Sequence, residues 1–271
     1  MKKIIALLLA ALLLCAPLSG CAEKEPVREI TVFAAASLTE TLTELGARFE
    51  KAHPGVQLIF NFGSSGKLAD QIAAGADCDL FLSAAPKQMD MLDLSCDAAK
   101  NPERRDFVDP NTRLDLLENK VALAVPAGNP KGVGSFDQLA EALRAGDILL
   151  AMGGQGVPVG QYTQKIFAYY GLDETALAAG SLLSYGEDVK AVTTLVAESL
   201  ADCGIIYQTD ACAAGLTVAD LATEAMCGRV VYPAAVLKTA KNGEGARGFL
   251  AYLQTAEAGT VFEAVGFTPL R

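Results

Sequence analysis

Short segments of small and hydroxyl-bearing residues follow the predicted strands of this chain at four places. They are Ala34-Ala35-Ala36-Ser37, Gly63-Ser64-Ser65-Gly66, Val157-Pro158-Val159-Gly160 and Glu187-Asp188-Val189. Ligands of open α/β sheets collect at the carboxyl ends of the strands, where the following helices present unpaired backbone N–H groups. Hydroxyls and amides at these positions could donate hydrogen bonds to a ligand.

Each segment also has an ordinary structural interpretation. Ser37-Leu38-Thr39-Glu40 fits a helix capping box, and Asp188 fits a helix N-cap. The Gly63–Gly66 segment could be a tight turn, and Tyr207, at the end of a short buried strand, could be a core aromatic residue. The small, uncharged run Val157–Gly160 is harder to explain this way, because it leaves backbone donors uncovered. No segment taken singly distinguishes ligand binding from a structural role.

Catalytic motifs are poorly matched. Gly63-Ser64-Ser65-Gly66 is not a G-x-S-x-G nucleophile elbow, and it is too short for a phosphate-binding Walker A loop. The single histidine, His53, stands at a predicted helix end with no evident serine or cysteine partner. A secreted hydrolase that uses Ser65 or a cysteine is therefore only an alternative to a binding protein.

Strands and helices must alternate to position these segments. Ile30–Ala34 predicts a buried strand, and Leu38, Leu42, Leu45 and Phe49 recur at helical spacing after it. Further strands, at 56–62 and 79–83, enclose a helix at 68–74, which gives a βαβαβ order. A second cycle begins at Lys120, with strands at 121–125, 148–152 and 204–207, and helices at 136–143, 161–170 and 189–199. This order predicts an α/β protein with largely parallel sheets.

The two cycles suggest two lobes. Beyond Arg229 a strand at 230–237 and two short helical segments are too little for a third lobe, so the chain is expected to return to the first. We therefore assign residues 29–112 and 234–271 to lobe 1 and residues 113–233 to lobe 2, with two hinge crossovers between them.

Composition narrows the function further. The chain of 271 residues has 22 lysines and arginines against 32 acidic residues, a net charge of −10. An acidic chain without a basic run repels a phosphate backbone, which argues against nucleic-acid binding. A lone histidine and the lack of any C-x-x-C pair argue against a metal site built from protein ligands.

The N-terminus predicts export. Met1-Lys2-Lys3 is followed by an apolar stretch, Ile4–Ala16, that is too short for a membrane-spanning helix of about 20 residues. Leu18-Ser19-Gly20-Cys21 resembles the bacterial lipobox, which implies removal of residues 1–20, a lipid anchor on Cys21 and a tether over 21–28. An ordinary cleaved signal is the alternative.

Export also bears on charge and on the cysteines. Cleavage would remove two lysines and no acidic residue, leaving a net charge of −12. Five cysteines would remain besides Cys21, namely Cys78, Cys96, Cys203, Cys212 and Cys227. Because five is odd, at least one thiol stays unpaired, and the sequence leaves the pairing open.

Several segments together resemble the molybdate-binding proteins of ABC transporters. The resemblance begins at Ile30–Leu38 and continues through Phe62–Leu68, Gln71–Ala76, Asp79–Ala84, Val157–Tyr162, Glu187–Val189, Gly204–Tyr207, Tyr232-Pro233 and Gly266-Phe267. It spans nearly all of residues 29–271 in order. Departures include Val159, where the family often has alanine, and Cys78, where proline is usual; neither removes a proposed donor.

The resemblance implies a type II periplasmic-binding-protein fold, each lobe a mostly parallel sheet flanked by helices, that holds a tetrahedral oxyanion between its lobes. The family's contacts fall on the hydroxyls and amides of Ser37 and Ser65, the amides of Val159 and Val189, and the hydroxyl of Tyr207. Ser64 could share the role of Ser65.

The implied function is that of a monomeric, lipid-anchored extracytoplasmic receptor. It would capture molybdate, and tungstate with it, and deliver the anion to a membrane-embedded ABC permease, with no cofactor and no direct bond between protein and metal. Receptors for sulfate or for tungstate alone are alternatives in the same class. The ligand-sensing module of a regulator is another, which the signal sequence and the missing DNA-binding helix pair argue against.

Overall fold

A computed structural model describes residues 27–270 of the chain. The predicted signal peptide, Cys21 and most of the tether lie outside these residues. Within them, no helix is both long enough and apolar enough to cross a membrane.

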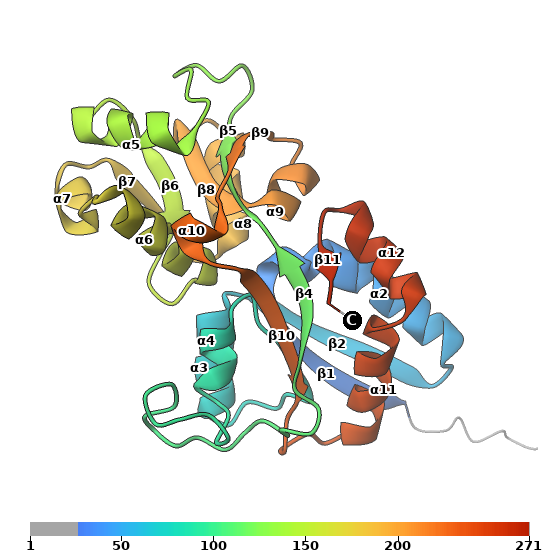
Figure 1. The fold of residues 1–271 in the computed structure, drawn as a ribbon. Helices are drawn as coiled ribbons and strands as arrows, with labels where there is room; N and C mark the ends of the chain where they lie inside the picture. Colours follow the sequence, from blue (N-terminus) through green and yellow to red (C-terminus); the bar gives the residue numbers. More distant parts are fainter. Residues whose placement is uncertain (1–26, 271) are drawn as a thin grey trace, which may run out of the picture.

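The first lobe is built on a six-stranded sheet whose strand order is β11-β4-β10-β3-β1-β2. Its strands are β1 (Arg28–Ala35), β2 (Val56–Gly63), β3 (Leu80–Leu82), β4 (Leu114–Asn119), β10 (Val230–Val236) and β11 (Thr268–Pro269). Its helices are η1 (Ala36–Leu38), α2 (Thr39–Ala52), α3 (Ser65–Ala73), α4 (Pro86–Asp90), α11 (Gly243–Leu253) and α12 (Ala256–Ala264). In Figure 1, α3 and α4 lie on one side of the sheet, and α2, α11 and α12 lie on the other.

The second lobe is built on a five-stranded sheet whose order is β7-β6-β8-β5-β9. Its strands are β5 (Val121–Val125), β6 (Leu150–Gly153), β7 (Leu183–Gly186), β8 (Cys203–Tyr207) and β9 (Thr217–Leu221). Its helices are α5 (Phe136–Ala145), α6 (Pro158–Tyr170), α7 (Glu174–Ala179), α8 (Val189–Ala197), α9 (Gln208–Ala213) and α10 (Glu224–Cys227). Both α6 and α8 pack against β6 and β8.

The alternation of side chains along β1 explains why both faces of the sheet are covered at this strand. Ile30, Val32 and Ala34 share one hydrophobic cluster with the leucines of α2. Phe33, between them in sequence, belongs to a second cluster with Leu68 and residues of α3 and α4. Successive side chains of a strand point to opposite faces, so an apolar run in both registers needs helices on both sides.

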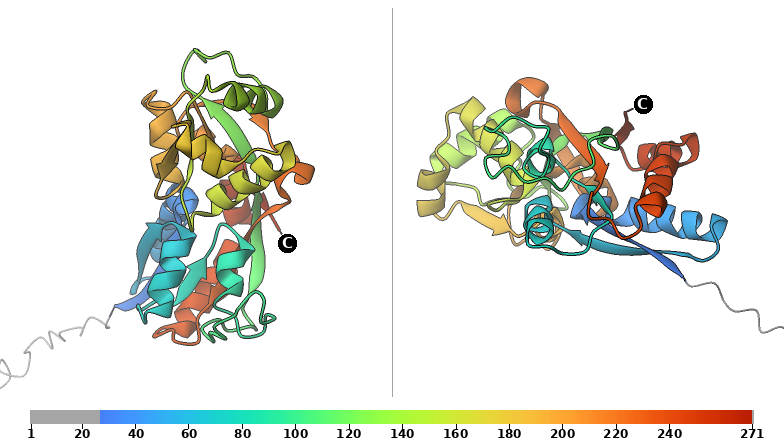
Figure 2. Two further views of the ribbon diagram at one scale, coloured as in Figure 1. Left: turned by 90° about the vertical axis from the view of Figure 1, so that its left-hand side faces the viewer. Right: turned by 90° about the horizontal axis from the view of Figure 1, so that it is seen from below.

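Two crossovers join the lobes. One runs from β4 to β5 through Lys120, and the other runs from β9 to β10 through α10. Figures 1 and 2 show both passing between the upper and lower lobes. The sheet pairing corrects the predicted boundaries, because β4 and all of β10 pair within the first sheet. Residues 114–119 and 230–233, which we assigned to lobe 2, therefore belong to the first sheet.

The crossovers also explain why the sheets are mixed and not mostly parallel. The pairs β1–β2, β1–β3, β6–β7 and β6–β8 are parallel, as the βαβ order predicts. The strands next to the crossovers, β4, β5 and β10, pair antiparallel with their neighbours. A strand that arrives from the other lobe is not bound to the right-handed crossover geometry that makes neighbouring strands parallel.

Candidate functional site

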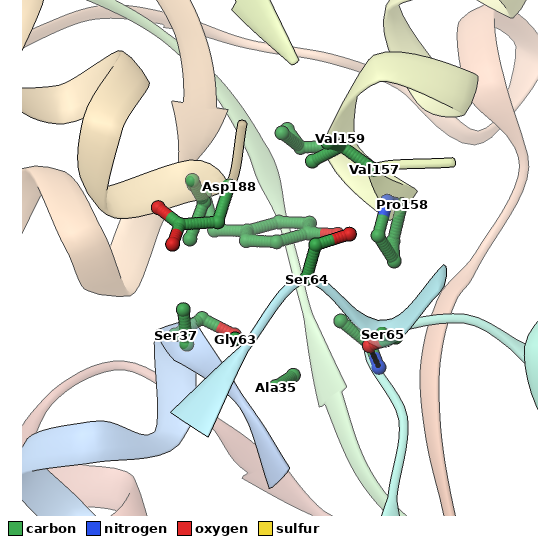
Figure 3. Close-up of a pocket in the computed structure, with 13 residues that line it drawn as sticks. Ala35, Ser37, Gly63, Ser64, Ser65, Val157, Pro158, Val159 and Asp188 are labelled. Carbon is green, nitrogen blue, oxygen red and sulfur yellow. Dashed lines mark hydrogen bonds between the residues drawn. The ribbon is translucent and has the colours of Figure 1, made fainter. Parts of the chain in front are cut away.

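A small pocket lies between the lobes where the four segments meet. All five residues proposed from the sequence line it, namely Ser37, Ser65, Val159, Val189 and Tyr207. The remaining lining residues are Ala35, Ala36, Gly63, Ser64, Ala84, Val157, Pro158 and Asp188. Figure 3 shows Ser37, Gly63 and Ser65 on one side, facing Val157, Pro158, Val159 and Asp188 on the other. The structure thus brings together segments far apart in the sequence.

Ser37 is buried at the point where β1 ends. It lies inside the short helix η1, and neither η1 nor α2 has a side-chain cap at its start, so the capping-box interpretation is wrong. The Ser37 hydroxyl is instead 2.9 Å from the hydroxyl of Tyr232 on β10. Glu40, the other half of the expected capping box, contacts Lys190 of the second lobe.

Ser65 is the first residue of α3 and is fully buried. Its hydroxyl oxygen accepts a hydrogen bond of 3.0 Å from the backbone N–H of Ala84, which leaves its own hydrogen free to be donated into the pocket. Ser64 occupies the N-cap position of α3 without capping it, and its hydroxyl is 3.4 Å from the carbonyl oxygen of Gly156. The Gly63–Gly66 segment is therefore a strand-to-helix junction that presents two hydroxyls to the pocket.

The second lobe contributes the first turns of two helices. Val159 lies in the first turn of α6, and Val189 is the first residue of α8. Backbone N–H groups in a first turn have no partner within their own helix, and the positive end of the helix dipole favours an anion beside them. Asp188 is the N-cap of α8, as its ordinary interpretation predicts, and accepts a hydrogen bond of 2.9 Å from the N–H of Ala191.

Tyr207 supplies a side-chain donor from the end of β8. It is 1% exposed, and its ring packs edge-on against the rings of Tyr162 and Tyr232. Burial raises the pKa of Tyr207 well above its usual value, so the phenol stays protonated. Its hydroxyl has no hydrogen-bond partner among the described residues. A buried hydroxyl without a partner costs about 1–3 kcal/mol, which a ligand in this pocket would offset.

The pocket is small and has no cationic lining residue. Its cavity volume is about 10 Å³, far below the range of roughly 300–1,000 Å³ typical of pockets for drug-sized molecules. Asp188 is the only charged residue among those that line it. A ligand held here would be bound by neutral hydroxyls and backbone amides, without a formal counter-charge.

The lobes are in contact beside the pocket. Gly66 in the first turn of α3 faces Gly156 of the second lobe so closely that a Cβ atom at position 66 would lie 2.3 Å from the Gly156 carbonyl oxygen. At the surface, Lys67 and Glu187 form an ion pair of 2.6 Å across the lobes, and Lys67 lowers the pKa of Glu187. The structure therefore shows the closed arrangement.

A second interlobe contact involves a buried charge. Lys190 of α8 is 2.8 Å from Glu40 of the first lobe and 3.2 Å from the buried Asp210 of α9. Burial raises the pKa of Asp210 to about 6, although Lys190 opposes the shift. Burial lowers the pKa of Lys190, but Asp210 and Glu40 more than offset this, so Lys190 remains charged.

Groups that a hydrolase or a metal centre would need are not assembled in the described part of the chain. The imidazole of His53 contacts the Phe49 carbonyl oxygen and stacks on the Phe49 ring. Burial raises the pKa of the Cys78 and Cys203 thiols to about 12, which suppresses the nucleophilic thiolate. Cys78, Cys96, Cys203, Cys212 and Cys227 form no disulfide there, and residues 27–270 contain no cluster of potential metal ligands.

Comparison with known proteins identifies the family. The family model for bacterial extracellular solute-binding proteins matches residues 30–268. The molybdate-binding protein ModA of Escherichia coli is 33% identical over 243 residues, which cover 89% of each chain. The chain belongs to the ModA family of solute-binding proteins. As a member of that family, this protein is the extracellular solute receptor of an ABC transporter and not an enzyme.

A second relative is similar to this ModA-family protein in sequence, and two solved structures are similar to it in fold. A Bacillus subtilis protein provisionally named as the ABC transporter substrate-binding lipoprotein YvgL is 32% identical over 276 residues, 99% of each chain. The periplasmic molybdate-binding protein of Azotobacter vinelandii has the same fold, with a TM-score of 0.74, 21% identity, and coverage of 89% of this chain and 100% of that one. The sulfate-binding protein SubI of Mycobacterium tuberculosis also shares the fold, with a TM-score of 0.70, 21% identity, and coverage of 90% and 87%.

Sequence reasoning missed two residues behind the pocket of this ModA-family chain. Tyr232 was part of the resemblance but was given no role, and Asn119 was not singled out. Neither lines the pocket, yet Tyr232 contacts Ser37 and Asn119 contacts Tyr232. The order of residues along the chain carries no signal for such contacts, because the three side chains come from three segments that are far apart in the sequence.

Proposed function

We propose that this solute-binding protein captures molybdate, and tungstate with it, and delivers the anion to its membrane permease. The observation that carries the proposal is the pocket itself, in which hydroxyls and helix-terminal amides converge without a cation. Ser37 and Ser65 would hold the anion from the first lobe, and Val159, Val189 and Tyr207 from the second. The ModA relatives, named as molybdate-binding proteins, support the choice of anion.

The expected strength of such a site agrees with this role. Micromolar to nanomolar binding corresponds to about 8–12 kcal/mol, and a hydrogen bond to a charged group contributes roughly 1.5–3 kcal/mol. Five to seven donors of the kinds found here are therefore sufficient after the costs of desolvation and lobe closure. Closure would complete the site, because each lobe supplies only part of the donors.

Neutral donors also select the protonation state of the ligand. A fully deprotonated oxyanion can accept hydrogen bonds at every oxygen, whereas a protonated phosphate has one hydroxyl that needs an acceptor. Sulfate is the competing ligand, since it carries no proton either. The likeness to the sulfate-binding protein is one of fold and leaves this alternative open.

A panel of oxyanions tests the proposal. Protein lacking residues 1–20 is expected to melt at a higher temperature in micromolar sodium molybdate or sodium tungstate, because a ligand that binds only the native state adds stability by mass action. Sulfate and phosphate at the same concentration are expected to change the melting temperature little. A flat profile across the panel would refute the receptor for molybdate, and a shift with sulfate alone would favour the sulfate receptor.

We also propose that the protein is attached to the outer face of the cell membrane by a lipid on Cys21, after removal of residues 1–20. The match of Leu18-Ser19-Gly20-Cys21 to a lipobox and the name of the lipoprotein relative support this. Full-length Cys21→Ala protein is expected to leave the membrane fraction of the producing cells, and Cys212→Ala, at an exposed cysteine, is expected to stay. Membrane recovery of the Cys21 variant equal to wild type would contradict lipidation at that residue.

A further inference from the structure

A buried chain of hydrogen bonds runs from the β4–β5 crossover to the ligand pocket. It joins Asn119 at the end of β4, Tyr232 on β10 and Ser37 on η1, and each of these residues is at most 5% exposed. The Tyr232 backbone sits where the pairing of β10 with β4 shifts register at Pro233. Tyr232 and Asn119 do not line the pocket, so any effect on the ligand must pass through Ser37.

The direction of each hydrogen bond follows from the groups available. The side-chain oxygen of Asn119 accepts from the backbone N–H of Lys120 at 2.8 Å, which identifies the other amide atom as the nitrogen. That nitrogen has two hydrogens and two acceptors, the Thr209 hydroxyl at 2.9 Å and the Tyr232 hydroxyl at 3.2 Å. Tyr232 therefore accepts from Asn119.

Counting donors and acceptors also gives the direction of the hydrogen bond between Tyr232 and Ser37. The hydroxyl of Tyr232 has one hydrogen, and besides Asn119, which donates to it, its hydrogen-bond partner within residues 27–270 is the Ser37 oxygen at 2.9 Å. Burial raises the pKa of Tyr232 well above its usual value, so this hydrogen is retained. If Ser37 donated to Tyr232 instead, the Tyr232 hydrogen would be buried without a partner, at a cost of about 1–3 kcal/mol.

We propose that Asn119 and Tyr232 are positioning residues that hold the Ser37 hydroxyl as a donor to the bound anion and so set a preference for fully deprotonated oxyanions. Ser37 accepts from Tyr232 and must direct its own hydrogen into the pocket. With one of the two acceptor lone pairs of Ser37 taken by Tyr232, a protonated ligand could donate to Ser37 only if the Ser37 hydrogen turned away from the ligand. This inference rests on the proposed function and assigns the origin of its selectivity to two residues outside the pocket.

The test compares two tyrosines that flank Tyr207. Tyr232→Phe removes the hydroxyl but keeps the ring that packs against Tyr207 and Phe267. Tyr162→Phe is the matched control, because its ring also packs edge-on against Tyr207 but Tyr162 does not line the pocket. Affinities for sodium molybdate, sodium sulfate and sodium phosphate are measured at about pH 8 by titration calorimetry, with competition against molybdate for the weak ligands.

Tyr232→Phe is expected to lower the affinities for molybdate and for sulfate alike, each by about tenfold, because Ser37 is no longer held as a donor. The affinity for hydrogenphosphate is expected to fall less or to rise. The ratio of the molybdate affinity to the hydrogenphosphate affinity is therefore expected to fall about tenfold. If Tyr232→Phe only disturbed the structure, the affinities for all three anions would fall by the same factor, and that result would overturn the proposal. Unchanged molybdate binding by Tyr232→Phe, or the same pattern in Tyr162→Phe, would also overturn it.

A second variant covers the case in which Tyr232→Phe does not fold. Asn119→Ala removes the hydrogen bond that places the Tyr232 hydroxyl beside Ser37, so Ser37 is held less firmly, and the same preference is expected to fall by about three- to tenfold. A preference equal to wild type would overturn the proposal. If the wild-type protein bound no oxyanion, the proposed function would be refuted. If the wild-type protein bound molybdate and the variants had the same anion preference as wild type, only the positioning role would be refuted.

Discussion

Gly66→Ala is expected to raise the dissociation constant for molybdate by about tenfold to a hundredfold while leaving the ligand-free protein at least as stable as wild type. In the closed arrangement a Cβ atom at this position would lie 2.3 Å from the Gly156 carbonyl oxygen, a backbone atom that cannot turn aside. Overpacking of this kind costs about 1–3 kcal/mol, and 1.4 kcal/mol corresponds to a factor of ten in affinity. The clash exists only when the lobes meet.

The same substitution is not expected to destabilise the ligand-free protein. Gly66 lies in the first turn of α3 with an ordinary helical backbone, so alanine there restricts the unfolded chain and stabilises the fold by about 0.4–1 kcal/mol. Melting curves with and without molybdate separate the two effects. X-ray scattering in solution is expected to show that wild type contracts on binding more than the variant does.

Gly248→Ala provides the control. Gly248 is exposed on α11, and nothing lies within 4 Å of a Cβ atom placed there. It is expected to bind molybdate as wild type does. If Gly66→Ala also bound normally, the pocket would not need the contact between α3 and Gly156, and closure would have to bring other residues together.

The segments that line the pocket could be picked out from the sequence because they depend on local signals. Runs such as Ile30–Ala34 mark buried strands, and the residues that follow them must lie at strand ends, where helices begin. Ser37, Ser65, Val159 and Val189 are all of this kind. Their assembly around one pocket needed the order of strands in two sheets, which the resemblance to a known family supplied and local patterns did not.

The crossovers could not be located in the same way. The strand β4 has the sequence Leu-Asp-Leu-Leu-Glu-Asn, whose charged residues resemble a surface loop. The second-lobe strand β9 is only partly buried along most of its length. Only the pairing of β4 with β10 and of β9 with β5 shows that these segments are strands. The contact from Asn119 to Tyr232 to Ser37 depends on that pairing, so no pattern within any one segment indicates it.

Ser37→Ala is expected to raise the dissociation constant for molybdate by about tenfold to 150-fold. The substitution removes a donor to a charged ligand, worth roughly 1.5–3 kcal/mol, from a pocket with no cation to compensate. It also leaves the Tyr232 hydroxyl without its acceptor, so the melting temperature of the ligand-free protein is expected to fall as well. Isothermal titration of the purified variant measures the loss of affinity directly.

Ser135→Ala separates this loss of donation from a general loss of stability. The Ser135 hydroxyl caps α5 in the second lobe by accepting from the N–H of Gln138, which is the role that the sequence pattern wrongly suggested for Ser37. Its removal is expected to cost about 1 kcal/mol of folding free energy and to leave molybdate affinity unchanged. If Ser37→Ala behaved like Ser135→Ala, losing stability at full affinity, Ser37 would be a structural residue, and the anion would have to be held by the remaining hydroxyls and amides.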